Sequence, residues 1–156
     1  DVWILPLFGD RKPIPFAQSE FNEFNGTFSP DGHWVAYASD ETGRGEIYAR
    51  LLDGSGGKIR ISTNGGRKPM WKLDRQILFT SNDRKLQVAY VKSSASSLAV
   101  DSIGTLFDFE SRSIVPNTID DVSNDGKQIL AIITESKQTS TPITLVVNWD
   151  EELKKK

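Results

Sequence analysis

The feature that most constrains this chain is a ten-residue motif that occurs twice without a gap. Residues 28–37 read FSPDGHWVAY, and residues 122–131 read VSNDGKQILA. A third copy at residues 71–79 is one residue shorter, because it lacks the glycine that follows the motif's aspartate. The three aspartates stand at 31, 74 and 125, so the motif returns after 43 and then 51 residues. A repeat of this length indicates that the chain is assembled from copies of one supersecondary unit.

The residues around the motif predict short β-strands joined by tight turns. Apolar, β-branched and aromatic residues alternate with polar ones in short runs, and Gly, Pro, Asn and Asp separate the runs. Helical periodicity is nearly absent, and only 150–156 reads as a last helical turn or tail. The chain is therefore expected to be all-β. The predicted strands are 2–7, 34–39, 46–52, 58–62, 76–80, 86–91, 128–134 and 143–149.

Units of about four short strands that repeat every 40 to 50 residues are typical of β-propeller blades. We expect four-stranded antiparallel sheets, with outer strands of one blade at 1–20, full blades at 24–66 and 68–101, a last blade without its outer strand at 105–150, and a tail at 151–156. The four units would hold two, four, four and three strands, 13 in all. A six-bladed ring needs roughly 24 strands. The expected fold is a partial β-propeller of about three blades, the C-terminal half of a longer propeller.

The repeats resemble the WD40-like, or PD40, repeats of TolB-like six-bladed β-propellers. The residues that carry the resemblance are 28–37 followed by Glu46-Ile47-Tyr48. The segments 1–7, 63–66 and 148–153 resemble the last blades of TolB-like propellers fused to bacterial serine/threonine kinases. The chain departs from the family pattern at Asp74-Arg75, where the turn glycine is missing, and at Asn124, where proline is expected.

The resemblance implies a non-catalytic interaction module that binds a protein or peptide partner, in a periplasmic or other extracytoplasmic location. An alternative stays open, in which the chain is the propeller portion of a larger enzyme. That enzyme would be a prolyl-oligopeptidase-like peptidase or a sugar-active propeller, with catalytic residues outside these 156 positions.

Composition excludes several kinds of site. The net charge of −2 and pI near 5.5 leave no basic footprint for nucleic acid. No apolar run is long enough to insert into a membrane. The absence of cysteine removes disulfides, thiolate metal sites and cysteine nucleophiles. We predict no cofactor, no metal and no catalytic residue in the chain.

Three motifs that suggest chemistry are better interpreted as turns. His33, the single histidine, lies in a Pro-Asp-Gly-His-Trp turn without a nucleophile elbow, so we expect it to face solvent. The run 54–58, GSGGK, fails the phosphate-loop pattern and should join the third and fourth strands of a blade. The run 121–126 resembles half of a calcium loop, but Ile132 stands where the bidentate glutamate belongs. In such turns an aspartate can accept a hydrogen bond from the backbone two residues on.

Large apolar residues supply the remaining expectations. The second strands of the units should be buried on both faces, at Trp34, Val35, Tyr37, Ile77, Phe79, Ile129 and Ala131. Most aromatic residues should fill the space between blades. The candidate partner-binding residues are Phe16, Phe21, Phe24 and His33, although core packing is the favoured role of the three phenylalanines.

Sheet edges at the two ends of the chain suggest assembly, because unpaired edges invite pairing. A homodimer could complete a six-bladed ring, if the last unit of one copy accepts strand 2–7 or 13–18 of another. The alternative is pairing with upstream blades of the same protein.

Overall fold

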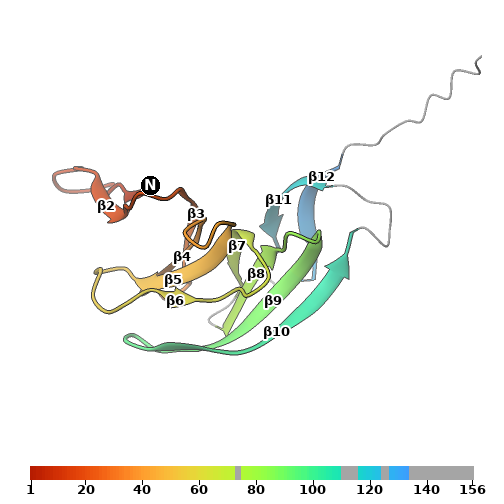
Figure 1. Cartoon of the computed structure of the whole chain (residues 1–156). Helices are drawn as coiled ribbons and strands as arrows, with labels where there is room; N and C mark the ends of the chain where they lie inside the picture. The colour runs from red at the N-terminus through yellow and green to blue at the C-terminus, as the bar shows by residue number, and fades with distance from the viewer. Residues whose placement is uncertain (73–74, 110–115, 124–126, 134–156) are drawn as a thin grey trace, which may run out of the picture.

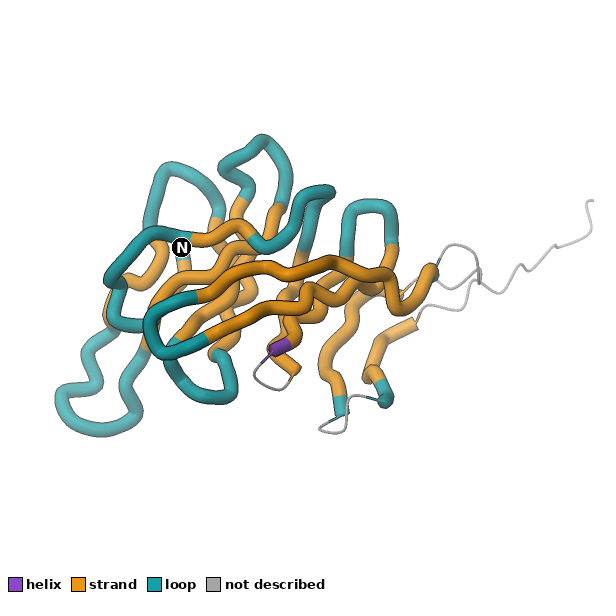
Figure 2. Tube along the Cα trace, turned by 90° about the horizontal axis from the view of Figure 1, so that it is seen from below, coloured by secondary structure: helices purple, strands orange, loops and turns teal. Residues whose placement is uncertain are grey.

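The computed structural model describes residues 1–72, 75–109, 116–123 and 127–133. Strands dominate these residues, and the one helical position is a single 3₁₀ residue at Arg75 (Figure 2). The chain is all-β, as its alternating apolar pattern predicts. The predicted strand at 143–149 and the tail at 151–156 lie outside the described residues.

Two four-stranded antiparallel sheets form the centre of the molecule. In both, the strand order follows the sequence, because short turns join consecutive strands. The first sheet contains β3 (Glu23–Phe28), β4 (Trp34–Ser39), β5 (Glu46–Leu51) and β6 (Ile59–Arg60). The second contains β7 (Arg67–Lys72), β8 (Gln76–Thr80), β9 (Lys85–Ser93) and β10 (Leu98–Asp108).

An antiparallel hairpin lies at each end of this pair: β1 (Val2–Ile4) with β2 (Ile14–Ala17), and β11 (Pro116–Val122) with β12 (Ile129–Ile133). The first hairpin repeats the outer half of the sheet that follows it. Trp3 pairs with Pro15 and Ile4 with Ile14. The pairs Tyr48–Arg60 and Ala49–Ile59 occupy the same register in β5 and β6.

Several strands differ in length from the prediction. Strand β1 covers only Val2–Ile4, where the sequence pattern predicts 2–7, and β9 covers Lys85–Ser93, where it predicts 86–91. The last strand of the first full sheet covers only Ile59–Arg60, where the sequence pattern predicts 58–62. Strand β10 continues to Asp108, across the expected boundary between the units 68–101 and 105–150. It stays paired with β9 through two bulges, which absorb the irregular positions without ending the strand.

The sheets stand side by side and pack face to face, with β1–β2 at one end and β11–β12 at the other (Figure 1). Side chains that alternate along each strand point to opposite faces, so each central sheet contributes to two apolar layers. The layer between the two full sheets includes Trp34, Ile47, Ile77 and Phe79. Stacked four-stranded antiparallel sheets of this kind are blades, so the fold is part of a β-propeller.

The burial of the second strands is confirmed in both full sheets. Trp34, Val35, Tyr37, Ile77 and Phe79 are each at most 4% exposed. Ala131 of β12 is partly buried against the neighbouring layer. The prediction for Ile129 is wrong, because this side chain is 37% exposed. It is the first residue of β12, in a hairpin against which, among the described residues, only the second full sheet packs (Figure 1).

The turn before β4 closes through its own side chains. The carboxylate of Asp31 accepts a hydrogen bond from the backbone N–H of His33 at 3.0 Å and another from the Ser29 hydroxyl at 2.5 Å. The Ser29 hydroxyl in turn accepts from the N–H of Trp34, and Gly32 supplies the positive φ of 74°. This confirms the expected turn role of Asp31. The corresponding Asp74 and Asp125 lie outside the described residues.

We expect Trp34→Ala to lower the free energy of unfolding by about 3–5 kcal/mol. The ring is 2% exposed between the two full sheets, and its indole N–H donates to the Ser94 carbonyl at 2.8 Å. Urea unfolding of both proteins measures the change. Trp34→Phe keeps most of the buried area and serves as the milder comparison. An unchanged midpoint in Trp34→Ala would show that this strand is not at the centre of the stack.

Candidate functional site

The first strands of the units, β3, β7 and β11, lie beside one another, and we call them the inner strands. In a propeller the first strand of each blade faces the central channel. Each inner strand carries a bulge, at residues 25–26 in β3, 68–69 in β7 and 120 in β11. Asn25 and Lys68 occupy equivalent places in their bulges, with φ of 55° and 52°. A bulge redirects side chains out of the regular alternation, so these positions can face a ligand.

The bulges line one hollow, which we call the inner-strand cleft. It has a volume of about 270 Å³. Its lining residues are Asn25, Gly26 and Thr27 from β3, Lys68, Pro69, Met70 and Trp71 from β7, and Asp120 and Asp121 from β11. Three consecutive units therefore contribute to a single surface.

Charged and polar groups give the cleft its chemistry. The Lys68 ammonium donates to the Asp120 carboxylate at 2.7 Å, which links the second full sheet to the hairpin that follows. Both side chains remain about one-third exposed, at 33% and 35%. The indole N–H of Trp71 is buried and has no acceptor among the described residues. The cleft thus offers an ion pair, an amide and a hydroxyl.

The four candidate residues from the sequence lie outside this cleft. Phe16 is 6% exposed and meets the Tyr37 ring edge-on, with centroids 6.0 Å apart. Phe24 is partly buried against the layer between the full sheets. Phe21 is 40% exposed, and His33 is exposed in the turn before β4, as expected. Packing thus covers Phe16 and partly covers Phe24, while Phe21 and His33 remain accessible.

Sequence reasoning missed the cleft because a bulge changes backbone geometry without a clear hydropathy signal. Asn25-Gly26 was the available signal, since asparagine tolerates positive φ better than most residues. Gly26 also permits a close approach, because a Cβ there would lie 2.9 Å from a methyl carbon of Val2. Lys68 gives no comparable sign, because lysine does not favour this conformation.

A buried carboxylate elsewhere is fully used by the fold. Glu46 in β5 is 0% exposed and accepts hydrogen bonds from the Ser62 hydroxyl, the Gly65 N–H and the Arg44 guanidinium. Burial acts to raise the pKa of Glu46, but these hydrogen bonds and the Arg60 charge outweigh it and hold the pKa below 4.5. A carboxyl group that stays ionised and fully hydrogen-bonded is a structural anchor and a poor proton donor at neutral pH.

The run 54–58 has the predicted place, in the connection between β5 and β6, the third and fourth strands of a sheet. Gly54 and Gly56 adopt positive φ there. Within the part of the chain that the structure describes, no three His, Cys, Asp or Glu side chains gather as a metal site requires. The same residues contain no helix with the length and apolarity to cross a membrane.

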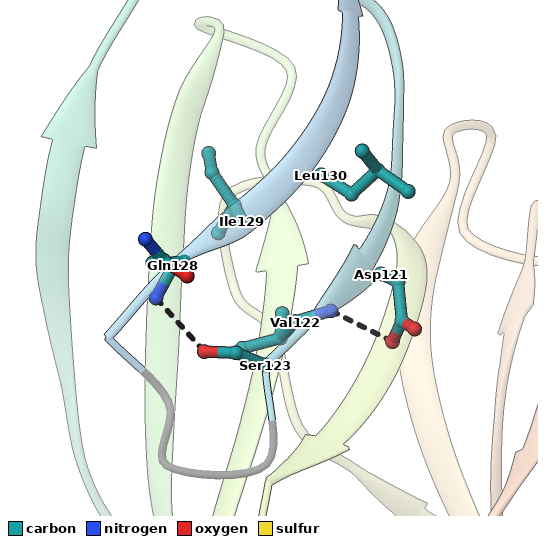
Figure 3. Close-up of a pocket in the computed structure, with 6 residues that line it drawn as sticks. All are labelled: Asp121, Val122, Ser123, Gln128, Ile129 and Leu130. Carbon is teal, nitrogen blue, oxygen red and sulfur yellow. Dashed lines mark hydrogen bonds between the residues drawn. The ribbon is translucent and has the colours of Figure 1, made fainter.

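A broader hollow lies on the hairpin β11–β12, where six residues of one hairpin line it (Figure 3). The Ser123 hydroxyl accepts from the Gln128 N–H at 3.0 Å, and the Asp121 carboxylate accepts from the Val122 N–H at 2.7 Å. The first bond joins the two sides of the hairpin, and the second lies within β11. Leu130 is 65% exposed and Ile132 is 55% exposed, so the described residues leave this face of the hairpin largely open.

Comparison with known proteins found similar chains among solved structures only. No protein-family model matches the chain, and no curated protein matches it. Among solved structures it is similar to one described as "The structure of putative TolB from Agrobacterium tumefaciens", with 25% sequence identity and a TM-score of 0.49. The match covers 64% of this chain and 38% of that one, so the chain spans well under half of the similar protein.

Asn25→Val should destabilise the protein by about 1–2 kcal/mol, because a β-branched residue is strained at positive φ. Asn25→Gly should be close to neutral, since glycine accepts this φ freely. Thermal and urea unfolding of the two variants give the comparison. Equal stabilities would show that residue 25 does not adopt the left-handed conformation.

Glu46→Gln should lower the free energy of unfolding at pH 7 by about 2 kcal/mol, because it removes a charged acceptor from three donors. The folded pKa is depressed, so the stabilisation is present above pH 4.5 and is lost as the pH falls through the folded value. The difference in stability between wild type and variant, measured from pH 7 to pH 2, should therefore shrink below pH 4.5. A difference that is constant with pH would contradict this role.

Proposed function

We propose that this chain is a non-catalytic interaction module, a TolB-like propeller segment whose inner-strand cleft binds a protein or peptide partner. The observation that carries the proposal is the convergence of three successive bulges on one hollow. The TolB-like assignment is supported by the repeat motif at 28–37 and its copies. The same proposal holds that this segment belongs to a kinase-fused protein and to a six-bladed ring.

A peptide suits the cleft better than a compact apolar ligand. The lining includes the Asn25 amide, the Thr27 hydroxyl and the Lys68–Asp120 pair, which match the alternating donors and acceptors of an extended backbone. Met70 supplies adaptable apolar contact.

Catalysis by the described residues has no comparable support. Glu46 is ionised and fully hydrogen-bonded, and His33 lies in an exposed turn outside the cleft. Neither residue is among those that line the cleft, where a substrate would meet the Lys68–Asp120 pair. We therefore place any reaction of a parent protein in residues beyond this chain.

Assembly is a second part of the proposal. The N-terminal hairpin exposes Trp3, Leu5, Leu7, Phe8 and Ile14, and the hairpin β11–β12 exposes Leu130 and Ile132. Large apolar groups at both ends of a stack favour a covering layer. Either a second copy or upstream blades of the same protein would complete the ring.

The binding proposal can be tested by selecting peptides from a random phage-displayed library on the 156-residue chain. Titration calorimetry then compares a selected peptide on wild type, Lys68→Ala and Lys92→Ala. Lys92 is the matched control, because it pairs with Asp101 at the same 2.7 Å but lies in the outer strands β9 and β10. We expect about tenfold weaker binding for Lys68→Ala, equivalent to about 1.4 kcal/mol, and no change for Lys92→Ala. Equal loss in both variants, or no enriched peptide, would contradict the proposal.

A further inference from the structure

A small polar pocket, which we call the interblade pocket, lies between the hairpin β1–β2 and the first full sheet. It has a volume of about 190 Å³. Its walls come from the end of β2 and residues 18–19, from Glu23, Tyr37 and Arg50 of the sheet, and from the turn that contains Lys58. All of them lie within residues 17–58, which the structure describes without a gap. None of them lines the inner-strand cleft, so the two sites are separate.

Glu23 brings a buried carboxylate to this pocket. The residue is 7% exposed, and its Oε1 accepts a hydrogen bond from the Ser19 hydroxyl. Its Oε2 is buried and accepts no hydrogen bond within the described part of the chain. The Asp1 ammonium stands 3.7 Å from Oε2 without donating to it. Because a buried carboxylate oxygen without a donor is costly, a ligand that donates to it gains binding free energy.

Arg50 brings a positive charge that is held in one orientation. Its guanidinium donates to the Phe16 carbonyl at 3.1 Å and to the Gly54 carbonyl at 2.8 Å. The guanidinium carbon also lies 5.9 Å from the centre of the Phe16 ring. Among the described residues, no carboxylate forms an ion pair with Arg50. An oriented guanidinium suits the carboxylate of a ligand, which can accept from two of its N–H groups at once.

Two further groups complete the polar surface. Burial raises the pKa of Tyr37 to about 12, so its hydroxyl stays neutral and can donate at neutral pH. The charge of Glu23 raises this pKa further and that of Arg50 lowers it, so both charges act on the same phenol. Lys58 adds an ammonium, which pairs with Glu41. The pocket therefore presents a negative and a positive group, each able to bind a ligand group of opposite charge.

We propose that the interblade pocket binds a free α-amino acid, with the ligand's ammonium at Glu23 and its carboxylate at Arg50. A simple cation would meet the like charges of Arg50 and Lys58, and a simple anion would meet Glu23. A ligand that carries both charges avoids both conflicts. The pocket is also smaller than the roughly 300–1,000 Å³ of sites for drug-sized ligands, which favours a molecule of this size.

The test screens the common L-amino acids one by one for a rise in the melting temperature of the 156-residue chain. Titration by NMR then measures the Kd of the strongest ligand and of two derivatives that each lack one charge. The N-acetyl derivative has no ammonium, and the primary amide has no carboxylate. Both should bind at least tenfold more weakly than the amino acid. Lys68→Ala should leave the Kd unchanged, which separates this pocket from the inner-strand cleft.

Glu23→Gln keeps the shape of the side chain and removes its charge. It should weaken binding of the amino acid at least tenfold but leave the Kd of the N-acetyl derivative unchanged, because that derivative has no ammonium for Glu23 to bind. Glu20→Gln, at an exposed position outside the pocket, is the matched control and should bind as wild type does. If Glu23→Gln does not fold, Arg50→Gln replaces it, with the primary amide as the derivative whose Kd should not change.

Two results would overturn the proposal. One is a screen in which no amino acid raises the melting temperature. The other is an equal loss of affinity for the amino acid and its N-acetyl derivative in Glu23→Gln, since the variant would then have damaged the pocket as a whole. An added N-terminal methionine turns the Asp1 ammonium into an amide and should not weaken binding, and a loss of binding in that form would contradict the proposal as well.

Discussion

A four-stranded sheet that is apolar on both faces needs a covering layer on each side, and this constraint determines the rest of the structure. Alternation places Trp34, Ala36 and Ala38 on one face of β4, and Val35 and Tyr37 on the other. The first face packs against β8 and β9, and the second against the hairpin β1–β2. Repeated packing of this kind gives a row of sheets. Every face in the row is covered only if the row closes into a ring or if its end sheets pack against another molecule.

The same constraint explains where the candidate binding surfaces lie. Stacking brings the inner strands together, and their bulges form the cleft around Lys68 and Asp120. Glu46 contributes to this arrangement by fastening residues 62–65, the connection that leads from one blade to the next.

The fold could be predicted because its signals are local and repeated. The turn at 29–32 follows directly from its Ser, Asp and Gly, and the burial of Trp34 and Phe79 follows from their place in the repeat. Other features depend on tertiary context. The exposure of Ile129 reflects its position in an end hairpin, which the pattern of its own strand cannot reveal. Lys68 was missed because its positive φ arises from a bulge that lysine itself does not favour.

Native-state hydrogen exchange read by mass spectrometry or NMR tests the central claim most directly, since it reports the opening free energy of each strand. The account predicts the slowest exchange in β4, β5, β8 and β9, which have sheets on both faces. It predicts faster exchange in β1, β2 and β12, which have a sheet on one face only among the described residues. Exchange in β4 as fast as in β1, or uniform exchange across all strands, would contradict a stack of blades with uncovered ends.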